Sequence, residues 1–259
     1  MGIVNVTPDS FSDGGRNAST ASALRHCEQL IKDGAHILDI GGESTRPGSP
    51  PVSLAEELAR VVPVVCDAAT LGVPISVDTY KPEVMQAVLD AGADIVNDIW
   101  ALRRGNALDV VAAHPRCGVC LMHMHRDPQT MQVAPMEGDV VPAVGVFLRE
   151  RALKLIERGV AHERIVLDAG VGFGKTVAQN FSLLARQREL MDLGWPLLAG
   201  WSRKSSLGAV TGREVPAERV AASVAAALLS VERGARVVRV HDVRETVDAL
   251  RIWQAIQPA

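Results

Sequence analysis

The sequence has 259 residues, 47% of them hydrophobic but only 3% aromatic, so a large core must be built from Val, Ile, Leu and Ala. Its formal net charge is −3 and it has no block of like charges, which gives no reason to expect a nucleic acid partner. No basic and apolar leader opens the chain, and no stretch approaches the roughly 20 apolar residues of a membrane span. We therefore expect a cytoplasmic protein without a membrane partner.

Eight short apolar runs, each followed by a polar residue or loop, are predicted as β-strands. The first run stops before Pro8, which cannot continue a ladder of backbone hydrogen bonds, and a polar loop follows at residues 7–17. The predicted strands are residues 2–6, 37–40, 74–77, 94–97, 118–122, 164–167, 196–199 and 236–240.

Amphipathic stretches with capping signals separate these runs and are predicted as helices. Ser19 or Thr20 can cap the first of them, and Pro82 suits the first turn of the third. Ser53 and Glu56 have the spacing of a capping box at the second. The predicted helices are residues 19–32, 53–69, 82–91, 106–113, 140–158, 177–190, 217–233 and 243–256.

Strand and helix alternate through the whole chain without a linker or a shift in composition. This order is typical of parallel βαβ units, and eight of them in this length fit a closed (β/α)8 TIM barrel formed by one domain, residues 1–259. An open, doubly wound sheet is the alternative. It would leave two edge strands, and no predicted strand looks like a protected edge.

The four cysteines do not form the pattern of a disulfide framework. Cys117 and Cys120 make a C-x-x-C at an apolar strand, where residues three apart point to opposite faces, and no second pair is present for zinc. We therefore expect reduced, structural thiols.

The carboxyl ends of the predicted strands carry polar residues, and in a TIM barrel the active site lies at these ends. So many polar groups on one rim indicate a polar ligand. They are Asn5, Asp39, Asp78, Asn97, His123, Asp168, residues 202–205, Arg239 and His241.

Two short patterns on this rim suggest other chemistry. Residues 169–176, AGVGFGKT, fit a loose phosphate-loop pattern, but such a loop usually follows an early strand and begins with Gly, whereas Ala169 stands first here. His123 and His125 form an H-x-H pair, although the sixth strand adds only Asp168 as a further metal ligand. We therefore expect neither nucleotide binding nor a dedicated transition-metal site.

Eight motifs give a more specific indication: NVTPDSFSDGG, GGESTRPG, SVDTYKP, NDI, LMHM, GFGK, SRKS and RVHD, in this order. Together they resemble the dihydropteroate synthase family over essentially the whole chain. The resemblance implies a transferase of folate biosynthesis and sulfonamide target that joins 6-hydroxymethyl-7,8-dihydropterin pyrophosphate to p-aminobenzoate with Mg²⁺. A pterin- or folate-dependent methyltransferase of the same barrel family and a non-catalytic pterin-binding fragment are the alternatives.

A pterin edge presents an amino group and a ring N–H in one plane, and one carboxylate can accept both hydrogen bonds. Asp168 is the candidate for this role, and Asp78 and Asn97 complete a polar pocket. The resemblance implies a pterin site made by Asp78, Asn97, Met122, Asp168, Lys204 and Arg239.

A pyrophosphate leaving group needs cations and hydrogen-bond donors, and Mg²⁺ prefers oxygen ligands, phosphate oxygens included. The resemblance implies that Asn5 ligates Mg²⁺. It also implies a pyrophosphate site made by Asn5, Thr45, Arg46, Arg239 and His241.

The second substrate, p-aminobenzoate, is expected to meet loop residues. The resemblance implies a dissociative reaction, in which loss of pyrophosphate leaves a cation at the exocyclic methylene and the aniline nitrogen then attacks. The protein contributes positioning, anion stabilisation and exclusion of water. The residues implied for aminobenzoate are Phe11, Thr45, Pro47, Phe173, Lys204 and Ser205. The catalytic residues implied are Asp13, Asp168, Lys204 and Arg239.

The sequence departs from the family pattern in two places. Ala169 stands where the family usually has a proline after the sixth strand, and the chain begins inside the first motif. We therefore expect a looser loop after Asp168 and the absence of the family's usual segment before the first strand. The resemblance also implies a homodimer, and the Ala-rich helix 217–233 offers small residues for close helix–helix contact.

Overall fold

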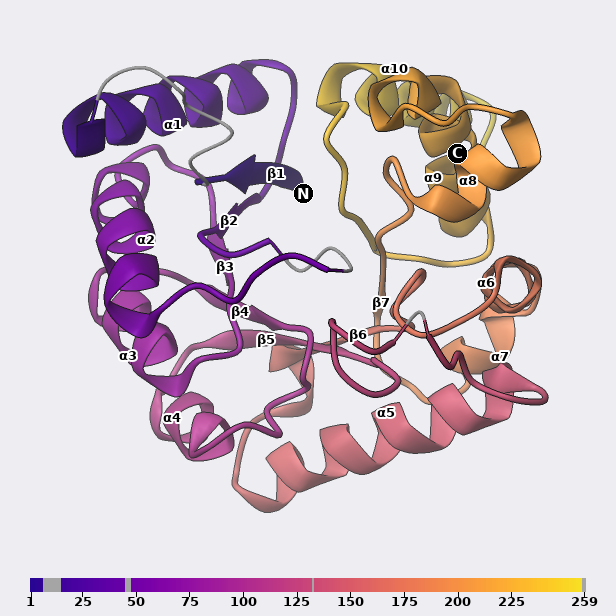
Figure 1. The fold of residues 1–259 in the computed structure, drawn as a ribbon, viewed down its shortest axis with the longest axis horizontal. Coiled ribbons are helices and arrows are strands. Elements are labelled where there is room, and N and C mark those ends of the chain that lie inside the picture. The colour runs from indigo at the N-terminus through magenta and orange to yellow at the C-terminus, as the bar shows by residue number, and fades with distance from the viewer. Residues whose placement is uncertain (7–14, 45–47, 132, 258–259) are drawn as a thin grey trace.

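A computed structural model describes residues 1–6, 15–44, 48–131 and 133–257, with the backbone alone for residues 15–19. Within these residues, eight parallel strands form one sheet, and each strand pairs with the next along the chain (Figure 1). They are β1 (Gly2–Asn5), β2 (Leu38–Gly41), β3 (Ile75–Asp78), β4 (Ile95–Asp98), β5 (Gly118–Met122), β6 (Ile165–Asp168), β7 (Leu197–Ala199) and β8 (Val237–Val238).

The sheet closes on itself between β8 and β1. Gly2 forms a parallel bridge with Val240, just beyond β8. The N–H of Ile3 donates to the carbonyl of Val240 over 3.0 Å, and the N–H of Val240 donates to the carbonyl of Met1 over 3.0 Å. The predicted (β/α)8 barrel is therefore confirmed, and the open doubly wound alternative is wrong.

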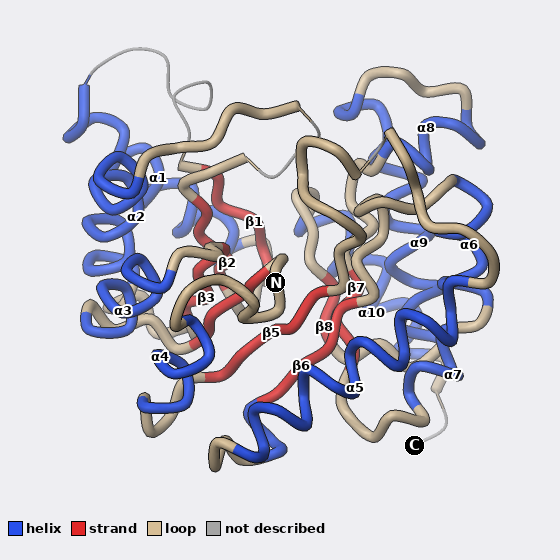
Figure 2. The backbone as a smooth tube through the Cα atoms, turned by 60° about the horizontal axis from the view of Figure 1, so that its bottom comes forward, coloured by secondary structure: helices blue, strands red, loops and turns tan. Residues whose placement is uncertain are grey.

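Helices follow the strands and cover the outside of the barrel (Figure 2). None of those in the described ranges is long and apolar enough to cross a membrane. They are α1 (Gly15–Lys32), α2 (Leu54–Ala68), α3 (Pro82–Asp90), α4 (Ala107–Ala113), α5 (Val140–Glu157), η2 (His162–Arg164), α6 (Val177–Ala185), α7 (Gln187–Met191), α8 (Ser205–Thr211), η3 (Pro216–Arg219), α9 (Val220–Glu232) and α10 (Val243–Ala255).

Side-chain capping marks where three of these helices begin. At α5 the Asp139 carboxylate accepts a hydrogen bond from the N–H of Val141 over 3.1 Å. The Ser53 hydroxyl accepts a hydrogen bond from the N–H of Glu56 over 3.3 Å at the start of α2. The Glu56 side chain pairs with Arg60 instead of returning to Ser53, so only half of the predicted capping box is formed. A complete capping box joins Thr176 and Gln179 at the start of α6, and their spacing in the sequence is that of the pattern.

Three features of the helices differ from the prediction: one start, one break and one additional helix. α1 begins at Gly15, before both predicted capping residues, so that prediction is wrong. The predicted helix 177–190 is divided at Arg186, where the backbone leaves the helical region at φ −104° and ψ 20°. The third difference is α8, which begins at Ser205 in a segment expected to be a loop. It has only seven residues, too few for a periodic apolar pattern to be recognised.

Side chains on the strands alternate between the helical layer and the barrel interior. On β2, Leu38 and Ile40 are fully buried in the apolar layer with Val61 of α2. Asp39, between them, points the other way and accepts a hydrogen bond from Ser76 of β3. The outer face of the sheet thus supplies the apolar core, and the inner face is left for polar groups.

The cysteines follow the same division. All four lie within the described ranges as free thiols, Cys66 exposed and the others buried. Cys117 packs in the outer apolar layer, whereas Cys120 faces the barrel interior. Burial raises the pKa of the Cys120 thiol, and the carboxylates of Asp168 and Asp39 raise it further.

Candidate active site

Arg239 lies at the centre of the polar groups inside the barrel. Its Nε is 2.5 Å from Oδ2 of Asp39, and its Nη2 is 2.9 Å from Oδ2 of Asp78. Asp39 also accepts hydrogen bonds from the Ser76 hydroxyl (2.6 Å) and from Nδ2 of Asn97 (3.2 Å). Strands β2, β3 and β4 and the end of β8 are therefore tied together under the opening of the barrel.

Burial and charge act in opposite directions on this group. Burial alone would lower the pKa of the Arg239 guanidinium, but the carboxylates of Asp39 and Asp78 raise it above its ordinary value. Burial raises the pKa of Asp78 to about 7, although the charge of Arg239 opposes the shift. Asp39 and Asp78 thus share one guanidinium, and its charge does not fully offset the cost of burying the ionised Asp78.

Asp168 stands at the end of β6 and is bound differently. Its Oδ1 accepts one hydrogen bond, from the N–H of Gly170 over 2.7 Å, and within the described ranges no hydrogen bond reaches its Oδ2. Burial raises its pKa, while the Gly170 N–H and the nearby charges of Lys204 and Lys175 oppose that shift. The carboxylate therefore has one oxygen available to a ligand.

Phe173 and Lys204 form one wall of the opening. The Lys204 ammonium lies 4.2 Å from the centre of the Phe173 ring, within cation–π range. Phe173 is buried in an apolar cluster with Met122 and Ile99. Gly172, next to Phe173, has the left-handed conformation at φ 83° that favours glycine.

Contacts of Arg203 with three side chains fix the SRKS segment. Arg203 has a left-handed conformation at φ 59°, and its N–H donates to the Ser223 hydroxyl over 2.8 Å. Its guanidinium is paired with Asp242 at 2.6 Å. The guanidinium of Arg219 donates to the carbonyl of Arg203 over 2.9 Å. These contacts set the position of Lys204, the next residue.

His241 is held by Ser202. The Ser202 hydroxyl lies 2.9 Å from Nδ1 of His241 and accepts from the backbone N–H of His241 over 3.1 Å. When the hydroxyl donates to Nδ1, the ring proton is left on Nε2, where it can donate to an anion.

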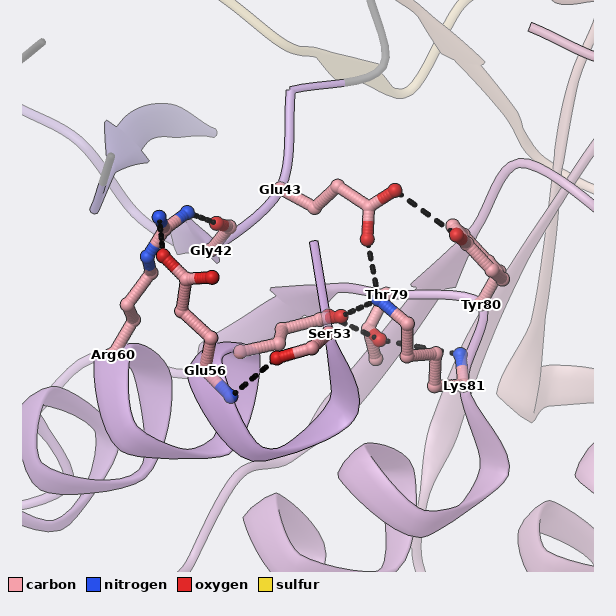
Figure 3. A network of polar contacts seen from close by, with 9 residues as sticks. Gly42, Glu43, Ser53, Glu56, Arg60, Thr79, Tyr80 and Lys81 are labelled. Atoms are coloured by element: carbon pink, nitrogen blue, oxygen red, sulfur yellow. Dashed lines mark hydrogen bonds and ion pairs between the residues drawn. The ribbon is translucent and has the colours of Figure 1, made fainter. Parts of the chain in front are cut away.

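A second charged network joins the chain after β2 to the chain after β3. Figure 3 shows Glu43 accepting a hydrogen bond from the Tyr80 hydroxyl (2.9 Å) and pairing with the Lys81 ammonium. Lys81 also pairs with the buried Glu57, which accepts from the Thr79 hydroxyl over 2.6 Å. Burial alone would lower the pKa of Lys81, but the two glutamates raise it. The lysine therefore stays charged between two carboxylates.

The same figure shows how the beginning of the β2–α2 connection is fixed. Arg60 of α2 donates to the carbonyl of Gly42 over 2.7 Å (Figure 3). Further along, the hydroxyls of Ser44 and Ser49 are 2.9 Å apart. Both ends of residues 44–49 are thus close together, next to the anchored Glu43.

The structure brings together only some of the predicted site residues. Asn97, Asp168 and Met122 are buried at the barrel opening with Asp78 and Arg239. Asn5 is exposed at the end of β1, and Ser205 is exposed at the start of α8. Phe11, Asp13, Thr45, Arg46 and Pro47 lie outside the described residues.

Two groups had no predicted role. Asp39 was recognised as a polar strand end, but its position beside Arg239, on a strand 200 residues away, has no local signal. Lys175 was read as part of a loose phosphate-loop pattern. Its ammonium donates instead to backbone carbonyls, so it cannot serve a phosphate there.

The H-x-H pair of the rim, His123 and His125, does not form a metal site with other described residues. The described residues contain no group of three or more His, Cys, Asp or Glu that could hold a metal ion. Burial lowers the pKa of His123 to about 2, and the ring is packed edge-on against Phe147 at 4.9 Å. His123 is therefore a neutral, packed side chain in this fold.

Comparison with known proteins shows the family of the chain. Residues 1–241 match the pterin binding enzyme family. The chain is 52% identical to a dihydropteroate synthase of Neisseria meningitidis serogroup B over 263 residues, which covers 99% of this chain and 92% of the relative.

Solved structures give the same result. Xanthomonas albilineans dihydropteroate synthase with 4-aminobenzoic acid has a TM-score of 0.94 and 52% identity, covering 100% of this chain and 93% of that one. Burkholderia cenocepacia dihydropteroate synthase complexed with 7,8-dihydropteroate has a TM-score of 0.89 and 55% identity, covering 99% of this chain and 90% of that one. The chain therefore belongs to the pterin binding enzyme family and, within it, to the dihydropteroate synthases.

Proposed function

We propose that the chain condenses 6-hydroxymethyl-7,8-dihydropterin pyrophosphate with p-aminobenzoate to give 7,8-dihydropteroate and pyrophosphate. The observation that carries this proposal is the buried Asp168, whose Oδ2 has no hydrogen bond within the described ranges. A planar heterocycle with two adjacent N–H donors fits such a carboxylate, because Oδ2 can accept a hydrogen bond that the described residues do not supply.

The pterin would lie on the strand ends. Asp168 accepts from its amino group and ring N–H, and Asn97 and Asp78 face it from the opposite side of the barrel. The guanidinium of Arg239 is planar and can lie along the ring. Met122 gives the pocket an apolar side next to Phe173. Lys204, beside Phe173, can donate to the pterin and border the second substrate.

The reaction proposed is dissociative. The C–O bond to pyrophosphate breaks first, both electrons leave with the pyrophosphate, and the pterin stabilises the methylene cation. The amine of p-aminobenzoate then forms the C–N bond and loses its proton to water. Arg239 and His241, with Thr45 and Arg46, stabilise the leaving anion.

The proposed cofactor is Mg²⁺, and the donor available to it is compatible with that ion. The amide oxygen of Asn5, exposed at the end of β1, is a hard, neutral ligand of the kind that Mg²⁺ accepts alongside phosphate oxygens and water. When bound, Mg²⁺ supplies charge neutralisation of the pyrophosphate. Asn5 holds the ion on the rim, where the leaving group departs.

The p-aminobenzoate site is proposed at the Phe173 and Lys204 wall. The aromatic ring packs on Phe173, and the carboxylate lies near the exposed N-terminal residue of α8, Ser205. Loop residues Phe11, Thr45 and Pro47 complete the proposed pocket. The family resemblance assigns a catalytic role to Asp13 of the first loop. Water is excluded while the cation exists, because water would otherwise capture it.

One experiment tests the function. The protein is incubated with the dihydropterin pyrophosphate, p-aminobenzoate and Mg²⁺, and release of pyrophosphate and formation of dihydropteroate are measured. Stoichiometric appearance of both products supports the synthase. Pterin binding without pyrophosphate release would leave the non-catalytic fragment, and methyl transfer from a methylated folate would favour the methyltransferase.

A cytoplasmic homodimer is the proposed state of the protein. Helix α9 consists largely of Ala and Val, and Leu229 is 40% exposed on it, so its outer face suits close packing against a second copy. Light scattering at micromolar concentration is expected to give twice the chain mass of 27.6 kDa. A monomer would contradict the dimer without affecting the catalytic proposal.

A further inference from the structure

Lys175, at the end of the glycine-rich connection between β6 and α6, has an unusual environment for a lysine. It is only 3% exposed. Its ammonium donates to the carbonyls of Gly170 (2.9 Å), Phe173 (3.1 Å) and His123 (3.4 Å). In the described part of the chain no carboxylate pairs with it. The three N–H donors of the ammonium thus meet three backbone acceptors.

The backbone of this connection is shaped so that the carbonyls converge. Gly170 has φ 66°, and a Cβ there would lie 1.8 Å from the carbonyl oxygen of His123. Gly174 has φ 71°, and a Cβ there would lie 2.7 Å from Cβ of His125. Only glycine permits both the left-handed conformation and this approach to the chain leaving β5. The ammonium then joins the two segments.

Two functional side chains depend on the segment that the ammonium holds. Gly170, whose carbonyl it binds, donates its own N–H to Asp168 over 2.7 Å. Phe173, whose carbonyl it also binds, carries the ring that lies 4.2 Å from the Lys204 ammonium. The lysine itself is buried, with its ammonium among the backbone carbonyls.

We propose that Lys175 is a positioning residue for the p-aminobenzoate site: its ammonium fixes the backbone of Gly170 and Phe173 and thereby the wall formed by Phe173 and Lys204. This inference rests on the proposed function, because the substrate is assigned there. A lysine in a phosphate loop donates to phosphate oxygens. Here the three N–H donors of the ammonium are hydrogen-bonded to backbone carbonyls.

The charge of Lys175 depends on its surroundings. Burial lowers the pKa of the ammonium to about 7; Asp168 on β6 opposes this, and Lys204 after β7 adds to it. From the chain after β5, His123 stays neutral, and burial lowers the pKa of His125 as well. Above neutrality the amine keeps two donors for three carbonyls, so one contact to the backbone is lost.

The main test is Lys175→Met, which keeps the chain length and removes the donors. The KM for p-aminobenzoate is expected to rise about tenfold, because Phe173 lies in the connection that the ammonium holds. The KM for the dihydropterin pyrophosphate should change less than about twofold, because Asp168 is fixed by the pairing of β6 with β5 and β7 and can lose only its contact with Gly170. The exposed Lys154→Met on α5 is the matched control and should leave both values unchanged. An unchanged aminobenzoate KM, or an equal rise of both values, overturns the proposal.

A pH profile gives a readout that a merely structural role would not move. In the wild-type protein the aminobenzoate KM should rise between pH 7 and pH 9, as the ammonium loses its proton. In Lys175→Met it should be high and independent of pH over this range. The same rise with pH in Lys175→Met as in the wild-type protein would overturn the proposal, because another group would then cause it.

A third measurement needs no turnover. Hydrogen exchange of the amides in residues 170–174 should be faster in Lys175→Met than in Lys154→Met, with exchange in β2 and β3 unchanged. Equal exchange in the two variants counts against the proposal. An inactive wild-type protein would instead refute the proposed function, and the exchange result would still decide whether Lys175 fixes the segment.

Discussion

The two sides of the barrel opening hold their charged groups in different ways. On the side of β2, β3 and β8, buried carboxylates share a cation. Arg239 lies between Asp39 and Asp78, and Lys81 lies between two glutamates. On the side of β5 to β7, counting contacts among the described residues, the Asp168 side chain accepts a single backbone hydrogen bond and Lys175 donates only to carbonyls.

This difference indicates which charged groups hold the structure of the barrel opening and which are available to bind a ligand. A carboxylate that is paired with a fixed guanidinium has little left to offer a ligand, whereas one with an unpaired oxygen gains when a donor arrives. The β2–β3 side therefore mainly holds the shape of the barrel opening, and its Asp78, Asn97 and Arg239 add a smaller part of the proposed pterin contacts. The β5–β7 side is where we expect the binding energy for the pterin and the aminobenzoate to be gained.

The largest expected effect is on the paired side. Arg239→Met leaves Asp39 and Asp78 buried without a cation, which should cost about 3–5 kcal/mol in the free energy of unfolding. Urea denaturation at pH 8 measures it, because the carboxyls cannot easily escape by binding protons there. The exposed Arg244→Met, which breaks a surface pair with Asp33, is the control and should change little. An equal loss of unfolding free energy in both variants would show that the buried pairs of Arg239 stabilise the fold no more than a surface pair does.

The pH dependence of stability sharpens the same point. The folded-state pKa of Asp78 is about 7, above the ordinary value of about 4 for an aspartate, so folding takes up a proton between these values. Its contribution to stability is therefore complete below about pH 4 and is lost as the pH rises through 7.

The matching variant is Asp78→Asn, which cannot titrate. Relative to the wild-type protein, its free energy of unfolding should improve by about 2–4 kcal/mol between pH 4 and pH 8. Urea denaturation at several pH values gives this difference. A constant difference would mean that Arg239 compensates Asp78 completely.

On the other side, Asp168→Asn keeps the oxygen that accepts from Gly170 but places an NH₂ where the free Oδ2 was. Binding of the dihydropterin pyrophosphate should weaken by about 1–3 kcal/mol, because donor then faces donor. Stability should fall less than in the Arg239 variant. Calorimetry measures the affinity, and an unchanged value would remove Asp168 from the pterin site.

The fold was predictable from sequence because its signals are local. Strand ends, Pro82 at the start of α3 and the Ser53 cap are all read within a few residues. The short α8 and the break at Arg186 were missed, since neither has a periodic pattern long enough to interpret. Local signals therefore give the order of elements better than their ends.

The site was predictable only in part. Asp168 and Arg239 were found at strand ends, and motif resemblance assigned their roles. The link between Asp39 and Arg239 needs closure of the barrel, which joins the first strands to the last. No role could be predicted for Lys175, because its partners are carbonyls, and carbonyl directions depend on the left-handed glycines and not on side-chain identity.

The smallest expected effect is a coupling between ligands at the connection after β2. Glu43 is anchored by Tyr80 and Lys81, and the hydroxyls of Ser44 and Ser49 meet, so the base of this connection does not depend on a ligand. Our hypothesis from the sequence is that pyrophosphate and Mg²⁺ fix the residues between, Arg46 among them, and so complete the aminobenzoate pocket. Fixing a residue costs about 1–2 kcal/mol, which a ligand as small as p-aminobenzoate cannot offset alone.

Aminobenzoate should therefore bind at least about tenfold more tightly with pyrophosphate and Mg²⁺ present than without them, a coupling free energy above about 1 kcal/mol. Arg46→Ala should remove most of this coupling and leave the affinity for the bare pterin nearly unchanged, because the pterin contacts lie on the strand ends. Calorimetric titration of aminobenzoate in the two conditions measures the coupling. If the two affinities were equal in the wild-type protein, the pocket would be complete before pyrophosphate binds, and recognition on the β5–β7 side would not depend on the paired side.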